Sequence, residues 1–134
     1  MLLLLYIDLD GLKSINDTLG HSQGDLALVT LAMALKSSSR NADIIARIGG
    51  DEFAVVTEIV SKVQAQERVT RLRSSVLATS AERFPPRLLS ISVGIAIYDP
   101  FYPVTIEMLL AQADSLMYEE KNRKKSITLD IVSG

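Results

Sequence analysis

The spacing of apolar residues changes along the first third of the chain, and each change predicts an element. Residues 2–9 form a continuous apolar run, interrupted only at Asp8, which indicates a strand buried on both faces. Residues 12–20 predict a short helix that ends at a glycine, and residues 21–24 predict a loop. From residue 25 to about residue 38 the apolar positions follow one face of a second helix.

The rest of the chain predicts a hairpin and two further helix–strand units. Residues 43–57 read as a β-hairpin, and a helix is expected to start at Ser61. Residues 89–97 alternate large apolar residues with serine, glycine and alanine, which predicts a strand with one face of small side chains. Thr105 is a good cap for a third long helix, and residues 126–132 predict a last strand.

This order of elements predicts an α+β fold, an α/β sandwich with a ferredoxin-like core. We expect a mainly antiparallel five-stranded sheet with the helices packed on one face. In such a sheet the first strand pairs with the second strand of the hairpin. That pairing would bring Asp8 close to Asp51 and Glu52. Three adjacent carboxylates are costly unless a cation neutralises them.

Composition narrows the chemistry of this cluster. The 134 residues suit a single domain, here residues 1–134, and 48 % apolar content is enough for a core. A net charge of −2 gives no reason to expect binding to nucleic acid or to a membrane surface. The chain has no cysteine and one histidine, so a bound metal would have oxygen ligands, as Mg²⁺, Mn²⁺ and Ca²⁺ prefer. The first apolar run is too short to span a membrane, and a core strand at the very start suggests that the natural protein continues upstream.

The hairpin carries the most distinctive local pattern. Two apolar runs flank Gly49 and Gly50, followed by Asp51 and Glu52. A glycine pair predicts a tight turn with positive φ. Because glycine and aspartate are common turn residues, this stretch alone is equally compatible with a plain polar hairpin tip.

Acidic and basic residues elsewhere suit a site for a metal and a nucleotide. Asp8 and Asp10 at the strand end would join the hairpin acids as ligands for one or two Mg²⁺, although ending a strand is a sufficient role for them. The lysines at positions 13, 121 and 125 would hold phosphates, or would be ordinary solvated surface lysines.

Two further polar residues would suit a guanine edge, and three others have plainer explanations. The amide of Asn16 and the carboxylate of Asp25 match the acceptor and donors of guanine, but a helix-interior Asn and an N-cap Asp are the structural alternatives. Arg40 and Asp43 alone would be a surface ion pair of little energetic value. His21, in the predicted loop, is read as structural or exposed.

With these residues in view, the chain resembles the GGDEF family of diguanylate cyclases. The resemblance is carried in order by four blocks, residues 8–25, 47–53, 92–96 and 113–121, the second of which contains the name-giving Gly-Gly-Asp-Glu-Phe. It implies a palm-like, nucleotidyl-cyclase-like fold. It also implies that two GTP molecules, one on each of two facing domains, condense to cyclic di-GMP and pyrophosphate.

The resemblance also implies roles for individual residues. Asp8, Asp51 and the Leu9 carbonyl would bind two Mg²⁺ (or Mn²⁺) per active site, and Glu52 would assist metal binding or deprotonate the 3′-hydroxyl. The other implied positions are the guanine-binding Asn16 and Asp25, the phosphate-binding Gly11, Leu12, Lys13, Lys121 and Lys125, the hairpin glycines Gly49 and Gly50, and a product-inhibition site of Arg40, Asp43 and Arg71. Lys125 stands where the family favours arginine, so it keeps the charge without the bidentate fork.

The implied partners are GTP, cyclic di-GMP as product and inhibitor, a second GGDEF domain in a homodimer, and an upstream sensory or regulatory domain. The expected location is the cytoplasm, either free or as the cytoplasmic part of a membrane-anchored protein. The helical segment that usually precedes the family's first strand is missing from this sequence. The alternative function is a catalytically silent module that binds GTP or cyclic di-GMP. A single-nucleotide cyclase or polymerase-like palm is a more distant alternative. The intact Asp8, Asp51 and Glu52 favour the enzyme.

Overall fold

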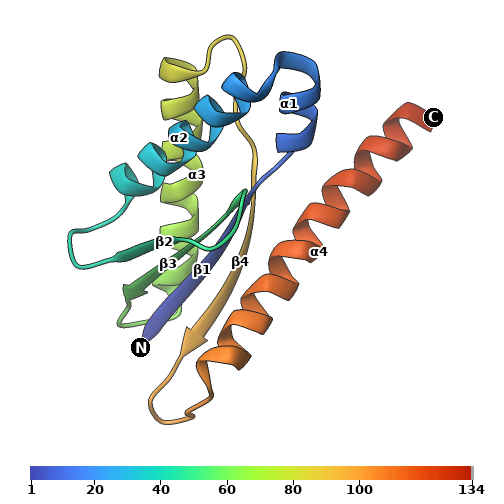
Figure 1. Cartoon of the computed structure of the whole chain (residues 1–134). Coiled ribbons are helices and arrows are strands. Elements are labelled where there is room, and N and C mark those ends of the chain that lie inside the picture. Colours follow the sequence, from blue (N-terminus) through green and yellow to red (C-terminus); the bar gives the residue numbers. More distant parts are fainter. Residues whose placement is uncertain (134) are drawn as a thin grey trace.

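The computed structural model describes the backbone of residues 1–133 and the side chains of residues 1–125. The elements in order are β1 (Leu2–Leu9), α1 (Leu12–Leu19), α2 (His21–Ser38), β2 (Ile44–Arg47), β3 (Glu52–Glu58), α3 (Val63–Arg83), β4 (Ile91–Tyr98) and α4 (Ile106–Ser133). The strands form one antiparallel sheet in the order β2-β3-β1-β4 (Figure 1). The predicted α+β class and the pairing of the first strand with the second hairpin strand are therefore confirmed.

The central strand β1 has a hydrophobic core on each of its faces. Leu3, Leu5, Ile7 and Leu9 belong to the core that α2 and α3 cover, whereas Leu4 and Tyr6 belong to a second core beneath α4. Figure 1 shows α4 on the opposite side of the sheet from α2 and α3. The expectation of helices on one face was wrong, because a strand that is apolar on both faces needs cover on both.

The small residues of β4 are what allow α4 to lie close to the sheet. A Cβ added at Gly94 would come within 1.7 Å of the Ala113 carbonyl oxygen and within 2.5 Å of the Met117 nitrogen. Ala96, two positions along the strand, is also buried beneath α4. The face of small side chains predicted for this strand is thus the contact surface for α4.

Two predicted elements were wrong. Residues 21–24, expected as a loop, form the first turn of α2. Residues 126–132, expected as a fifth strand, continue α4, so the described chain has four strands. Alternating apolar residues favour a strand only where a neighbouring strand supplies hydrogen bonds, whereas a helix makes its backbone bonds locally.

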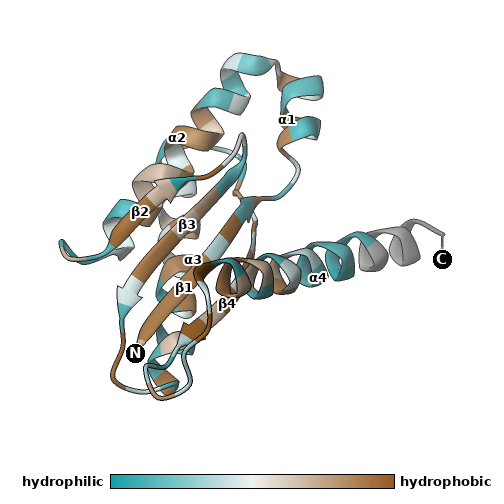
Figure 2. Cartoon of the chain, turned by 60° about the horizontal axis from the view of Figure 1, so that its bottom comes forward, coloured by the Kyte–Doolittle hydropathy of each residue, from teal (hydrophilic) through white to brown (hydrophobic). Residues whose placement is uncertain are grey.

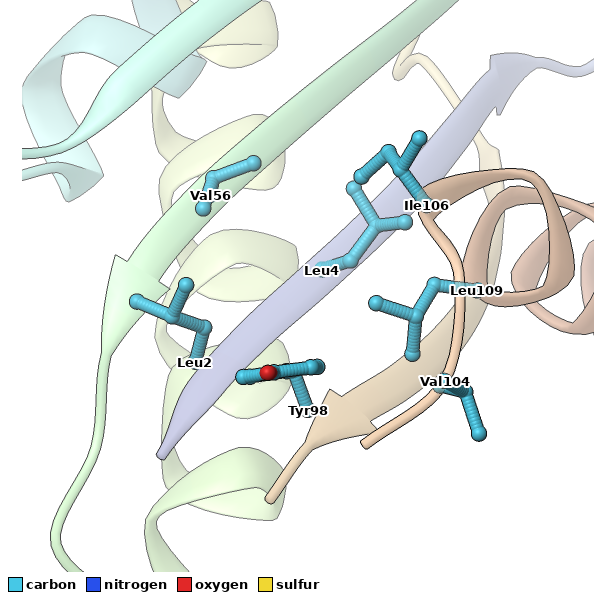
Figure 3. A pocket seen from close by; sticks show the side chains of 7 residues that line it. All are labelled: Leu2, Leu4, Val56, Tyr98, Val104, Ile106 and Leu109. Carbon is cyan, nitrogen blue, oxygen red and sulfur yellow. The ribbon is translucent and has the colours of Figure 1, made fainter. Parts of the chain in front are cut away.

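Hydropathy is distributed as expected for a sheet enclosed by helices. Figure 2 shows the strands predominantly hydrophobic and the middle of α4 mostly hydrophilic. Among the described residues, no helix combines the length and the apolar character needed to cross a membrane.

Candidate metal centre

Three carboxylates meet where β1 ends beside the hairpin tip. Asp8 is directly opposite Glu52 in the β1–β3 register, and the Leu9 N–H donates a hydrogen bond of 3.1 Å to the Asp51 carbonyl oxygen. One side-chain oxygen from each of Asp8, Asp51 and Glu52 lies within 4.8 Å of the others. The predicted convergence of these three acids is therefore present.

Asp8 is the most buried of the three, with 4 % of its surface exposed. Its Oδ2 accepts a hydrogen bond of 2.7 Å from Lys121 Nζ, but its buried Oδ1 has no hydrogen-bond partner in the described part of the chain. Burial raises the pKa of Asp8 to about 6, with Asp51 adding to the rise and Lys121 opposing it. For Lys121, burial disfavours the charged form, but its bond to Asp8 and the nearby acids outweigh this and raise its pKa.

Glu52 has a partner that the sequence did not point out. The Tyr6 hydroxyl donates a hydrogen bond of 2.8 Å to Glu52 Oε2. Burial, followed by the bond to Glu52 and its charge, raises the pKa of Tyr6. Alternate residues of a strand share a face, so Tyr6, two residues before Asp8, lies on the same face as Asp8. This spacing was the signal in the sequence that could have identified Tyr6 as a neighbour of the acids.

The donor set suits a hard divalent cation. Mg²⁺ and Mn²⁺ are bound mainly by carboxylate oxygens, and the cluster offers three acids without sulfur or imidazole. A buried carboxylate oxygen without a donor is costly, and a cation would remove that cost. Asp8, Asp51 and Glu52 therefore fit a divalent metal.

The hairpin tip differs in detail from the predicted tight turn. Residues 48–51 connect the strands, and the N–H groups of Ile48 and Gly49 both donate to the Glu52 carbonyl oxygen, at 2.9 and 3.3 Å. Neither Gly49 nor Gly50 has positive φ, so the expected reason for glycine was wrong. A four-residue connection does not demand the left-handed conformation. Arg47, also missed, donates to the carbonyls of Gly49 and Gly50 at 3.2 and 2.6 Å and steadies the tip.

The Asn16 side chain on α1 lies against Gly24 of α2, the residue before Asp25. A Cβ at Gly24 would overlap Asn16 Oδ1 at 1.7 Å, so Gly24 makes room for this side chain against α2. Asp25 is not an N-cap, because α2 already begins four residues earlier, at His21. The His21 side chain is exposed. The N-cap alternative for Asp25 is therefore excluded, and the exposed carboxylate has no capping role.

Asp10 does not belong to the carboxylate cluster. It accepts hydrogen bonds of 2.7 Å from each of Ser90 Oγ, Ser92 Oγ and Lys124 Nζ. Burial alone would raise the pKa of Asp10, but these donors outweigh it and lower the pKa. Through these hydrogen bonds Asp10 connects the end of β1 to β4 and to α4. On α4 the bond comes from Lys124, whereas the neighbouring Lys125 is exposed.

The phosphate positions expected on α1 lie at its N-terminus. Gly11 takes the left-handed conformation, with φ 72°, and starts the helix without a side-chain cap. The first residues, Leu12 and Lys13, follow directly, and Lys13 is exposed. The amide groups at a helix N-terminus favour anions.

Arg40 and Asp43 form more than a surface pair. Arg40 donates from its guanidinium to Thr57 Oγ1 (2.8 Å) and to the Glu58 carbonyl (2.7 Å), while the Asp43 side chain is 2 % exposed. Asp43 Oδ2 accepts a hydrogen bond of 2.6 Å from the buried Arg68, a residue that the sequence analysis did not single out. Arg71, the arginine expected at this site, is exposed. Burial would raise the pKa of Asp43, but its donors and the charges of both arginines lower it. A cavity of about 390 Å³ opens beside Arg40 and Asp43.

Known proteins share this chain's fold and motifs. The family model described as "Diguanylate cyclase, GGDEF domain" matches residues 1–126. Diguanylate cyclase A of Treponema denticola is 38 % identical over 128 residues, covering 94 % of this chain and 34 % of that protein. The GGDEF domain of PA1120 (YfiN or TpbB) from Pseudomonas aeruginosa is 38 % identical, with a TM-score of 0.79 over 91 % of this chain and 76 % of that one.

A further solved structure describes an interaction mode between a microbial GGDEF domain and cyclic di-GMP. It is 31 % identical, with a TM-score of 0.74 over 91 % of this chain and 73 % of that one. The chain spans about a third of the length of the curated relatives that it matches. With the family match extending from the first strand into α4, the chain belongs to the GGDEF-domain family.

Proposed function

We propose that the chain is a catalytic GGDEF domain, a diguanylate cyclase that condenses two GTP molecules into cyclic di-GMP with release of pyrophosphate. The observation that carries this proposal is the buried, unpartnered Oδ1 of Asp8 within reach of Asp51 and Glu52. A module that only binds a nucleotide has no need of such a costly cluster. The retained acids therefore favour catalysis over the alternative of a silent regulatory module.

The roles at the metal centre follow from the donor set. Asp8, Asp51 and Glu52, with the Leu9 carbonyl, would hold Mg²⁺ or Mn²⁺, two per active site. Cations held there would lower the pKa of the attacking 3′-hydroxyl and would stabilise the charge on the leaving pyrophosphate. Glu52, which is less buried than Asp8, would accept the proton of that hydroxyl.

The nucleotide would lie between the carboxylates and α1. Asn16 and Asp25 would pair with the guanine edge, through an amide and an acceptor respectively. The uncapped N-terminus of α1 at Gly11, Leu12 and Lys13 suits the phosphates. Lys121 would add charge to the phosphates, with Lys125 further along α4. The absence of side chains at Gly49 and Gly50 would let the nucleotide approach the hairpin; an added Cβ at Gly50 would meet no protein atom within 4 Å.

Product formation needs two domains. Each 3′-hydroxyl would attack the α-phosphate of the nucleotide on the facing copy, so we propose a homodimer as the active unit. Cyclic di-GMP would inhibit by binding at Arg40 and Asp43, with Arg71 as a further contact. An upstream sensory or regulatory domain would control the dimer, in keeping with relatives about three times as long. With GTP as its substrate, the domain would act in the cytoplasm.

The test is incubation of the 134-residue chain with GTP and Mg²⁺ at several protein concentrations, with nucleotides resolved by chromatography. We expect cyclic di-GMP, with a rate that rises faster than linearly with protein, and no product from Glu52→Gln. Glu58→Gln is the matched control, because this exposed glutamate ends the same strand away from the cluster. Saturable GTP or cyclic di-GMP binding without turnover would instead support the silent module.

A further inference from the structure

The ring of Tyr6 is fixed by packing on both sides. Its neighbours across the sheet are Ala54 on β3 and Gly94 on β4, which leave room for an aromatic ring on the α4 face. The ring is 8 % exposed and belongs to the core that Ala113 and Met117 of α4 complete. The position of the Tyr6 hydroxyl is therefore set by the contact between α4 and the sheet.

Glu52 has no comparable packing of its own. It begins β3 directly after the glycine-containing tip and is only half-buried. Nearby Asp8 and Asp51 carry the same charge, and repulsion between like charges favours a rotamer that turns the Glu52 carboxylate towards solvent. The hydrogen bond of 2.8 Å from the Tyr6 hydroxyl to Oε2 opposes this movement. A phenol keeps its proton at neutral pH and so remains a donor.

We propose that Tyr6 is a positioning residue, whose hydroxyl holds the Glu52 carboxylate beside Asp8 and Asp51 in the geometry that binds a divalent cation. The inference rests on the proposed function in one respect, namely that the three acids bind a metal. Groups that orient a metal ligand in this way typically change metal affinity or activity by about 10–100-fold when removed.

The test compares Mn²⁺ binding by the whole chain and by Tyr6→Phe, which keeps the ring and loses only the donor. Calorimetric titrations are made in the presence of 3′-deoxy-GTP, which lacks the attacking hydroxyl and cannot condense. We expect the dissociation constant for Mn²⁺ to rise about tenfold in Tyr6→Phe. Tyr98→Phe is the matched control, because Tyr98 packs against the same core from β4. Its dissociation constant should equal that of the unaltered chain.

A second comparison separates positioning from a general loosening of the fold. In a Glu52→Ala background there is no carboxylate to hold, so adding Tyr6→Phe should leave Mn²⁺ affinity unchanged. A further loss in that background would overturn the proposal, as would a Tyr6→Phe affinity equal to that of Tyr98→Phe. The latter result would leave the proposed cyclase intact. Failure of the unaltered chain to bind Mn²⁺ would overturn both. With GTP and Mg²⁺, Tyr6→Phe should lower kcat about tenfold with little change in KM.

Discussion

Replacing Asp8 with asparagine should make the metal-free chain more stable at neutral pH. Asp8 is 4 % exposed, and one of its oxygens has no donor in the described structure. Asparagine has nearly the same shape and carries no charge to be buried. An increase in stability caused by removing a site residue indicates that the residue was kept for function.

The magnitude follows from the pKa of Asp8. Burial raises this pKa from the ordinary 3.8 to about 6, and each step of one in pKa corresponds to about 1.4 kcal/mol. The ionised carboxylate therefore lowers the unfolding free energy by about 3 kcal/mol at pH 7. Between these two pKa values the folded chain binds more protons at Asp8 than the unfolded chain does. The Asp8 contribution to stability consequently falls as the pH rises through this window.

The assay is urea unfolding followed by circular dichroism, with EDTA present, at pH 4.5 and pH 7. The unfolding free energy of Asp8→Asn should exceed that of the unaltered chain by about 3 kcal/mol at pH 7 and by about 1 kcal/mol at pH 4.5. Asp17→Asn, which removes one exposed carboxylate on α1, controls for net charge. An advantage for Asp8→Asn that is absent, or that does not grow with pH, would refute the argument. Mg²⁺ in place of EDTA should stabilise the unaltered chain but not the variant.

Three other substitutions test the packing around the site. Gly94→Ala should lower the unfolding free energy by more than about 2 kcal/mol, because its Cβ would strike the α4 backbone; urea denaturation measures this. Asp43→Asn should cost about 3 kcal/mol by leaving Arg68 buried without its counter-ion. The pKa of Asp43 is lowered in the folded chain, so the loss of unfolding free energy in Asp43→Asn should be present above a pH of about 4. It should disappear as the pH falls further and Asp43 of the unaltered chain becomes protonated, which the same urea assay measures. Gly24→Ala should displace Asn16 and raise the KM for GTP several-fold, with a stability change below about 1 kcal/mol; unchanged KM would argue against guanine recognition there.

Local pattern was sufficient for most of the fold. The apolar run of residues 2–9 determines a strand covered on both faces, and the alternation around Gly94 determines a strand with one small face. Together with the hairpin, these patterns determine the pairing that places Asp8 opposite Glu52. These predictions succeed because the alternation of side chains along a strand, and therefore which of them are buried, can be read from residues that are close together in the sequence. They fail at residues 126–132, where the choice between strand and helix depends on whether a pairing partner is available.

The contacts that tune the site were decided by tertiary structure. Lys121 reaches Asp8 across 113 positions because α4 packs on the second face of the sheet. Tyr6 reaches Glu52 across 46 positions because β1 pairs with β3 in one particular register. Likewise Arg68 of α3 reaches Asp43, which directly precedes β2, because α3 packs beside α2. The spacing of apolar residues alone did not distinguish Arg68 from the neighbouring arginines. The sequence by itself determined which acids share a strand end. Only the tertiary structure decided which donors hold them, because such contacts depend on the distance and rotation between elements.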